Sequence, residues 1–359
     1  MKVYNVGIVG ATGMVGQRFV TLLANHPWFR ICKLAASSRS AGKTYEEAAG
    51  KRWMMSVPMP ESVKNMVVLD AAEVGKVAEG LDAVFCAVDI KEKSVLRDLE
   101  DAYAKAEVVV VSNNSAHRST PDVPMIVPEI NPEHCAVIPA QRARLGTKRG
   151  FVAVKSNCSL QSYVPALHPL RDFGLEKVLV CTYQAISGAG KNFETWPEMI
   201  DNVIPYIGGE EEKSEREPMK LWGHVENGVI VDAVKPAITA QCIRVPVTDG
   251  HMAAVFASFA NKPSQEEILA RWKAYSSEPQ ALQLPSAPKQ FLHYFEDPAY
   301  PQTKLQRDLE GGMAVSIGRL RPDTQYDYKF VCLSHNTLCG AAGGAVELAE
   351  LLAAKGFMD

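Results

Sequence analysis

The chain has 359 residues, of which 47% are hydrophobic and 22% charged, and its formal net charge is -3. This length exceeds what one compact core usually serves, so we expect two domains, and the apolar content excludes a disordered protein. The small net charge excludes a general affinity for nucleic acid or an anionic membrane, and no apolar run approaches the roughly 20 residues of a membrane span. Since the opening MKVYNVGIVG also lacks the pattern of a signal peptide, we expect a cytoplasmic protein.

The first half of the chain alternates short apolar runs with helical periodicity. Strands are expected over 3–10, 31–38, 81–88 and 107–114, with another in MIVPEI at 125–130, and helices from about residue 14 and over 91–106. Runs so rich in Val and Ile indicate strands that are buried on both faces. We therefore predict an α/β domain with a doubly wound parallel sheet of Rossmann type.

After FVAVKSN, which ends at residue 157, the pattern changes. Longer strands are expected over 177–188, 240–248 and 251–260, with a helix over 264–275. This order indicates a second, α+β domain with a mixed sheet covered by helices. The last segment, 336–357, contains strong helix formers, but its residues alone do not say in which domain it packs.

A glycine-rich loop, GIVGATGMVG at 7–16, follows the first predicted strand and opens the first predicted helix. Glycines allow the backbone to approach a pyrophosphate, whose charge then lies at the helix N-terminus. We predict a dinucleotide site in this loop, the alternative being a glycine-rich turn without a ligand. The residues that would contact the cofactor are Gly10, Thr12, Gly13, Met14 and Val15.

The second predicted strand ends in Ser37, Ser38, Arg39 and Ser40. An NAD-specific fold usually has Asp or Glu here, where the side chain binds the ribose 2′-hydroxyl. Hydroxyl groups and a guanidinium suit a 2′-phosphate instead. The sequence therefore favours NADP over NAD, with Ser37, Arg39 and Ser40 as contacts, although a solvated turn would have the same composition.

Cys158 is the predicted nucleophile. An apolar strand runs into Ser156-Asn157-Cys158 and a helical pattern follows at once, so the thiol is expected at a helix N-terminus. The free amides there stabilise a thiolate, lower a pKa that is otherwise ~8.5, and can bind an oxyanion. An inert core cysteine is the alternative. The eight cysteines include no Cys-x-x-Cys pair, so we expect neither disulfides nor a metal site.

With these motifs the chain resembles the aspartate-semialdehyde dehydrogenase family, and most of all its archaeal and fungal branch. The resemblance covers nearly the whole chain and is carried by GATGMVG, SNCS, TYQAISGAG, EREPMK, IRVPVTDGH and NTLCGAAGGAV. It implies NADPH-dependent reductive dephosphorylation of β-aspartyl phosphate to aspartate semialdehyde through a thioester on Cys158. This reaction belongs to the biosynthesis of lysine, methionine, threonine and isoleucine.

The resemblance assigns two further catalytic residues. His251 would be the general acid and base, a task for which a side chain that titrates near neutrality is suited. Gln184 would orient the substrate. From the residues alone, His251 could equally be a core histidine at a turn, and Gln184 a polar strand end.

The same resemblance implies the substrate contacts. Arg244 would bind the α-carboxylate, Glu217 the α-amino group, and Lys220 and Arg118 the phosphate, with Asn157 also at the substrate. Because Pro218 disfavours helical geometry at the residue before it, Glu217 is expected just outside a helix, and Glu217 and Lys220 could diverge. The alternative for these charges is a solvated face, the reading we adopt for Glu210 to Glu212.

Near the nicotinamide, the resemblance adds Ser187, Gly188, Asn336 and Gly340, although Gly340 is also compatible with simple helix packing. It implies an NADP-binding domain over 1–156, a catalytic and dimerisation domain over 157–335, and a C-terminal helix over 336–359 that returns to the first domain. A homodimer or homotetramer is expected.

Two other functions are compatible with parts of this pattern. A related acyl reductase, of the N-acetylglutamyl-phosphate or malonyl-CoA type, would share the chemistry, but Glu217 suits a free ammonium better than an acetylated nitrogen. A noncatalytic NADPH redox sensor would need only an oxidisable Cys158 and no substrate-binding arginines.

Overall fold

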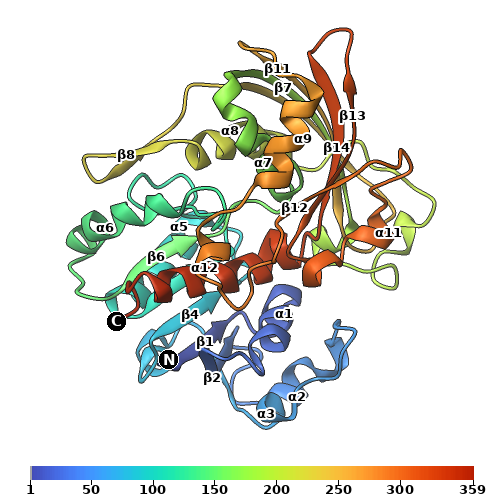
Figure 1. Cartoon of the computed structure of the whole chain (residues 1–359). Coiled ribbons are helices and arrows are strands. Elements are labelled where there is room, and N and C mark those ends of the chain that lie inside the picture. The colour runs from blue at the N-terminus through green and yellow to red at the C-terminus, as the bar shows by residue number, and fades with distance from the viewer. Residues whose placement is uncertain (1) are drawn as a thin grey trace.

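The computed structural model describes residues 2–359, which form two large sheets with helices on their faces (Figure 1). The strands of the first sheet are β1 (Tyr4–Val9), β2 (Phe29–Ala36), β3 (Val68–Asp70), β4 (Ala83–Cys86), β5 (Val109–Ser112) and β6 (Phe151–Val154). Their order is β3-β2-β1-β4-β5-β6, and all neighbours are parallel. The predicted doubly wound sheet is confirmed, with its crevice outside the carboxyl ends of β1 and β4.

Helices flank this sheet, and β4, β5 and β6 are buried along their whole length, as their apolar runs predict. The helices of this half are α1 (Met14–Leu23), α2 (Tyr45–Ala49), α3 (Glu61–Lys64), α4 (Val74–Ala78), α5 (Lys93–Lys105) and α6 (Ile138–Leu145).

The second sheet is mixed. Its strands are β7 (Leu175–Gln184), β10 (Ala237–Arg244), β11 (His251–Phe259), β12 (Leu292–Phe295), β13 (Val315–Pro322) and β14 (Tyr328–Ser334), in the order β10-β7-β11-β14-β13-β12. A separate hairpin joins β8 (His224–Glu226) and β9 (Val229–Val231). The remaining helices of this half are α7 (Leu160–Leu167), α8 (Glu210–Leu221), α9 (Gln265–Ala274), α10 (Glu278–Ala281) and α11 (Thr303–Gln306).

Strand register brings polar residues to one edge of the second sheet. Because β7 and β10 are parallel, Gln184 pairs with Arg244 at their carboxyl ends. Because β11 is antiparallel to β7, its first residue, His251, lies at the same edge, where it pairs with Ser334 of β14. Residues that are distant in sequence therefore meet at this edge.

The C-terminal helix, α12 (Gly343–Ala354), packs on the first sheet. Its Leu348 and Leu352 belong to one buried cluster with Ile8 and Phe85. In Figure 1 this red helix lies along the blue and cyan part of the molecule, and both termini are on that side. The placement that the residues alone left open is thus decided by packing on the first sheet.

One predicted strand is wrong. In MIVPEI only Met125 forms a bridge, with Val154, and a turn follows. Pro124 and Pro128 have no N–H group to donate to a neighbouring strand, so the apolar run at 125–130 does not form a strand. By contrast, the predicted helix over 264–275 is confirmed as α9, which Ser264 caps together with Glu267.

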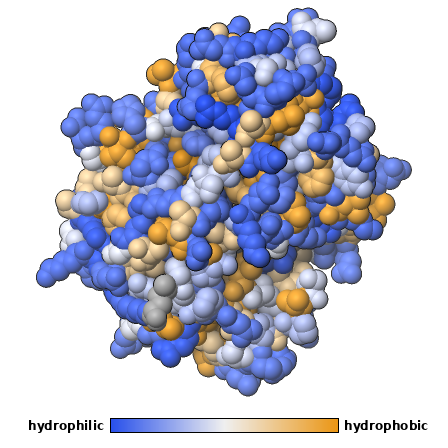
Figure 2. Space-filling model, in the orientation of Figure 1, coloured by the Kyte–Doolittle hydropathy of each residue, from blue (hydrophilic) through white to orange (hydrophobic). Residues whose placement is uncertain are grey.

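Within residues 2–359, none of the helices combines the length and apolar character that a membrane crossing requires. The face of the molecule in Figure 2 is mostly hydrophilic, and its apolar residues form separate patches.

Candidate active site

Cys158 lies in the turn between β6 and α7, two residues before the helix begins. Its Sγ is 3.5 Å from Nε2 of His251. The strand-to-helix position predicted from the sequence is therefore correct, and the turn brings the thiol to the edge of the second sheet at which β11 begins.

The low pKa expected for the Cys158 thiol is wrong. Burial raises the pKa of Cys158 to about 11, and the negative charge of Glu210 acts in the same direction, whereas the positive charges of Arg118 and Arg244 oppose it. Desolvation disfavours the charged form and here outweighs the favourable charges. The resting residue is a neutral thiol.

His251 is fully buried and neutral. Burial lowers its pKa to about 3, and the positive charge of Arg244 contributes. The backbone N–H of Ala185 donates to Nδ1 over 3.0 Å, so the proton of the neutral ring is on Nε2 and faces Sγ of Cys158. The resting ring can therefore donate a proton toward the sulfur, and to act as a base it must first give up the Ala185 hydrogen bond.

Two glycines allow close approach around this pair. A Cβ at Gly188 would be 2.9 Å from Nη1 of Arg244 and 3.1 Å from Nε2 of His251. A Cβ at Gly340 would be 3.1 Å from the Cβ of Cys158. Both were predicted as cofactor contacts, and the structure places both against the reacting groups, where a larger residue would displace them.

Asn336, also predicted at the cofactor, ties this region together. Its Oδ1 accepts from the N–H of Gly250 at 2.7 Å, and its Nδ2 donates to Oγ of Ser187 at 2.8 Å. The loop after β7 and the start of β11 are thereby joined to the loop after β14.

Glu210 corrects the prediction of a solvated face, because it is only 7% exposed and its carboxylate lies in the site. It accepts from Asn157 at 3.0 and 3.1 Å, from Gln184 at 3.2 Å and from Lys213 at 2.7 Å. Burial alone would raise the pKa of Glu210, but the charge of Lys213 and these hydrogen bonds outweigh it, so the pKa lies below its ordinary value. A buried carboxylate thus holds two predicted site residues, Asn157 and Gln184.

Arg244 is buried beside the pair. Its Nη1 donates to the carbonyl of Ala185 at 2.6 Å. Burial lowers its pKa, and the neighbouring Cys158 and Glu210 oppose that shift. A guanidinium remains charged throughout, so this position offers a fixed cation near the sulfur.

The structure also corrects the picture of Glu217 and Lys220. Helix α8 continues through Pro218, so the two residues stay one turn apart rather than diverging. The carboxylate of Glu217 is occupied by Arg118 at 3.0 Å and by the N–H of Asn157 at 2.7 Å. Lys220 donates to three backbone carbonyls, so its donors are used within the protein and not free for a substrate.

The predicted cofactor loop lines a cavity of about 660 Å³ at the carboxyl ends of β1, β2 and β4. Gly10 has φ +93°, and a Cβ there would be 2.3 Å from the carbonyl oxygen of Ala87, so only glycine fits. No side chain caps the first turn of α1, which begins with Met14 and Val15. Six predicted contacts line this cavity: Gly10, Thr12, Gly13, Ser37, Arg39 and Ser40.

Lys43 and Arg52 line the same cavity and were not predicted. Lys43 lies three residues beyond the serine-rich turn, and its positive charge next to that turn was the signal that could have identified it. Arg52, twelve residues beyond, had no such signal. A second cavity, of about 530 Å³, lies beside α8 and is lined by Arg118 and Lys213 among others.

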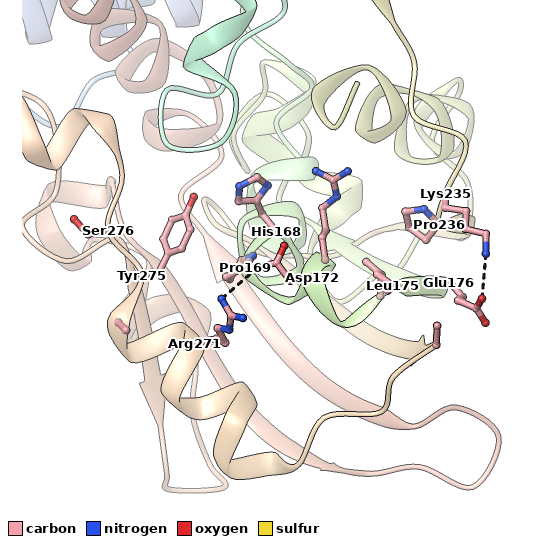
Figure 3. A pocket seen from close by; sticks show the side chains of 14 residues that line it. His168, Pro169, Asp172, Leu175, Glu176, Lys235, Pro236, Arg271, Tyr275 and Ser276 are labelled. Carbon is pink, nitrogen blue, oxygen red and sulfur yellow. Dashed lines mark hydrogen bonds and ion pairs between the residues drawn. The ribbon is translucent and has the colours of Figure 1, made fainter. Parts of the chain in front are cut away.

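A further cavity, of about 610 Å³, is at the opposite end of β7, around His168 and Leu175 (Figure 3). Its walls contain two ion pairs of the protein's own, one of which joins Lys235 to Glu176 at 3.1 Å. None of the predicted site residues lines it. The described residues also contain no group of three or more His, Cys, Asp or Glu side chains that could hold a metal ion.

Comparison with known proteins gives a consistent result. Two domain models match: semialdehyde dehydrogenase, NAD binding domain, over residues 5–138, and semialdehyde dehydrogenase, dimerisation domain, over residues 167–339. The aspartate-semialdehyde dehydrogenase of Archaeoglobus fulgidus is 41% identical over 351 residues, or 97% of this chain and 98% of that protein. The enzyme of the same name from Schizosaccharomyces pombe is 42% identical over 369 residues, with 100% of both chains covered.

The fold agrees with these relatives. A crystal structure of aspartate semialdehyde dehydrogenase with NADP from Candida albicans superimposes with a TM-score of 0.88 at 40% identity, over 99% of this chain and 100% of that one. Because similarity in sequence and in fold extends over the whole length, the chain belongs to the aspartate-semialdehyde dehydrogenase family.

Proposed function

We propose that this chain catalyses the NADPH-dependent reductive dephosphorylation of β-aspartyl phosphate to aspartate semialdehyde, a step in amino-acid biosynthesis. The observation that carries the proposal is the 3.5 Å contact between Sγ of Cys158 and Nε2 of His251, at an edge that also holds Arg244 and Glu210. Family membership supports the choice of substrate.

In the first half-reaction the sulfur of Cys158 attacks the acyl carbon. An S–C bond forms, the C–O bond to phosphate breaks, and inorganic phosphate leaves a thioester on the enzyme. Nε2 of His251 is the titratable nitrogen that faces the sulfur, so we assign to it the transfer of the thiol proton once the ring has left Ala185. In the second half-reaction the C–S bond breaks, and the same ring returns the proton to the sulfur.

NADPH, when bound, supplies the hydride that reduces the thioester carbon. The cavity at β1, β2 and β4 fits this cofactor, because the uncapped start of α1 offers backbone N–H groups to a pyrophosphate. Arg39, Lys43 and Arg52 line the same cavity and supply positive charge for a 2′-phosphate. The relative from Candida albicans was crystallised with NADP, which agrees with this assignment.

For the substrate we assign Arg244 to the α-carboxylate and Glu210 to the α-amino group. Glu210 replaces Glu217 in this role because its charge acts on Cys158, whereas the carboxylate of Glu217 is occupied by protein donors. Arg118, Lys213 and Lys220 all line the cavity beside α8, but Lys220 already donates to three backbone carbonyls. Lys213 therefore replaces Lys220 at the phosphate, together with Arg118. Asn157 and Gln184, which Glu210 holds, would orient the acyl group.

We also propose the division into an NADP-binding domain over 1–156, a catalytic and dimerisation domain over 157–335, and the returning segment 336–359. The second sheet offers a surface for a homodimer, because alternate residues of β11 are half-buried on the face away from the covering helices. Tyr183, at 36% exposure, is on the neighbouring strand, and Ile200 and Tyr206, at 62% and 65%, follow in the same half. The match to a dimerisation domain model supports this surface.

The alternative functions are less well supported. The relatives described above carry the name aspartate-semialdehyde dehydrogenase, which disfavours an N-acetylglutamyl-phosphate or malonyl-CoA reductase. A noncatalytic redox sensor would have no need for the buried cation Arg244 and the buried anion Glu210 beside the thiol.

Replacement of the nucleophile tests the proposal. Cys158→Ala should reduce turnover of aspartate semialdehyde, phosphate and NADP by a factor of at least about 10⁴, because no thioester can form, and should leave the dissociation constant of NADPH within about twofold. Acid-quenched wild-type enzyme should carry an acyl adduct on Cys158 in a mass spectrum. Substantial turnover by Cys158→Ala would exclude the covalent route.

A further inference from the structure

Glu217 and Lys220, one turn apart on α8, hold the loop that carries Arg118. Lys220 is 5% exposed, and its Nζ donates to the carbonyls of Arg118, Thr120 and Val123 at 2.8, 2.7 and 2.9 Å. An ammonium has three N–H donors, and three carbonyls receive them. The loop is thereby fixed from both sides of its turn to a single buried side chain.

Glu217 connects this loop to the nucleophile. One carboxylate oxygen accepts from Nη1 of Arg118 at 3.0 Å, and the other accepts from the backbone N–H of Asn157, the residue before Cys158, at 2.7 Å. Both bonds have a charged partner, and such bonds are stronger than neutral ones. A single carboxylate thus sets the position of Arg118 relative to the turn that carries the sulfur.

The guanidinium of Arg118 is fixed in its plane by further contacts. Its Nε donates to the carbonyl of Lys155 at 2.9 Å, and its Nη2 donates to the carbonyl of Asn113 at 3.0 Å. Together with the Glu217 contact, three of its five N–H donors are used, which leaves two for a ligand. Arg118 lines the cavity beside α8, so those two donors can meet an anion there.

We propose that Glu217 and Lys220 form an Arg118 clamp, a pair of positioning residues that keeps the phosphate-binding guanidinium at a fixed separation from the sulfur of Cys158. The inference rests on the proposed function, in which Arg118 meets the phosphate that Cys158 displaces. A small error in this separation would be costly, because a misplacement of about 1 Å can reduce a rate by two orders of magnitude.

The clamp is tested in the phosphorylating direction, with aspartate semialdehyde, inorganic phosphate and NADP, in two backgrounds. Lys220→Met in the wild type should lower kcat/KM for phosphate by about 10-fold or more through loss of orientation, with the dissociation constant of NADP within about twofold. In an Arg118→Ala background the same substitution should change kcat/KM for phosphate by less than about twofold, because coupled residues are not additive. Equal losses in both backgrounds would show that Lys220 meets phosphate itself and would overturn the clamp.

Lys273→Met is the matched control. Lys273 is exposed on α9 and does not line the cavity beside α8, so its replacement removes the same charge and leaves the three carbonyl contacts in place. It should change kcat/KM for phosphate by less than about twofold. A loss as large as that of Lys220→Met would assign the effect to net charge and would also overturn the clamp.

If Lys220→Met does not fold, Glu217→Gln takes its place, since the amide keeps the shape of the carboxylate. Because Glu217 also holds the N–H of Asn157, this variant should slow alkylation of Cys158 by iodoacetamide or acylation by substrate as well as phosphate use. Unchanged values of both would count against the clamp. Failure of the proposed function itself would be seen separately, as turnover by Cys158→Ala.

Discussion

At the scale of single residues, burial decides the charge states at the site. Cys158 and His251 face each other as a neutral thiol and a neutral imidazole, because desolvation moves the pKa of the thiol up and that of the ring down. The charges on Arg244 and Glu210 are retained beside them. Ionisation of the sulfur therefore depends on a change in this environment, such as the arrival of substrate.

The rate at which Cys158 reacts with iodoacetamide should report this directly. With a pKa of about 11, the thiolate fraction grows about tenfold per pH unit, so alkylation should rise steadily between about pH 7 and 9.5. Mass spectrometry of the peptide that contains Cys158 measures it. Glu210→Gln should increase the rate at each pH, because the carboxylate raises the pKa. An alkylation rate that levels off below about pH 8 would show that the pKa of Cys158 is low, as the sequence predicted.

The shifted pKa values of Cys158 and His251 also predict how the stability of the fold depends on pH. The folded-state pKa of Cys158 lies above its ordinary value of 9.0, so its contribution is fully present below pH 9 and is lost as pH rises toward about 11. The pKa of His251 is lowered from 6.5 to about 3, so its contribution is fully present above pH 6.5 and is lost as pH falls toward 3. Both contributions to stability are therefore fully present between pH 6.5 and pH 9.

At the scale of elements, helix α8 is continuous although Pro218 lies inside it. Proline has no N–H, so the carbonyl of Ser214, four residues earlier, lacks the donor that an α-helix normally supplies. The hydroxyl of Tyr163, on α7, donates to that carbonyl at 2.9 Å. A tertiary hydrogen bond thus replaces the missing helical one and keeps Glu210 and the Arg118 clamp on one rigid element.

Removal of that hydroxyl should be costly only while Pro218 is present. Tyr163→Phe should reduce the free energy of unfolding by about 1–3 kcal/mol, because a buried carbonyl loses a hydrogen-bond donor. In a Pro218→Ala background the new N–H can satisfy Ser214, so the same change should cost less than about half as much. Chemical denaturation of the four proteins measures the coupling, and purely additive losses would mean that Tyr163 contributes through packing alone.

At the scale of the whole molecule, α12 joins the two halves of the site. It packs on the first sheet, and the segment just before it places Asn336 against Ser187 and Gly340 against Cys158. The start of α12 packs closely because Gly344 has no side chain. A Cβ at Gly344 would be 2.3 Å from Cε of Lys155 and 2.4 Å from the carbonyl oxygen of Cys339. Lys155 is three residues from the nucleophile, so a change in the packing of α12 against Lys155 would also move the turn that carries Cys158.

Gly344→Ala should therefore disturb both stability and activity. We expect a loss of about 1–3 kcal/mol in the free energy of unfolding from overpacking, and a lower kcat as the Cys158 turn shifts. Gly75→Ala, in α4, is the control, because no atom lies within 4 Å of its added Cβ, and it should stabilise by about 0.4–1 kcal/mol with unchanged kcat. Thermal unfolding and steady-state assays compare the two, and a gain in stability for Gly344→Ala would contradict the proposed contact.

The sequence by itself determined the parallel sheet, the glycine loop and the position of Cys158, because each depends on residues that are neighbours in the chain: a strand, a turn and the start of a helix. Only the tertiary structure decided that Glu210 is buried in the site while Glu217 and Lys220 hold a loop, since all three are charged residues on one helix and their roles depend on what packs against each face. The tertiary structure alone also decided the charge states of Cys158 and His251, because desolvation depends on the surrounding residues and not on the sequence motif.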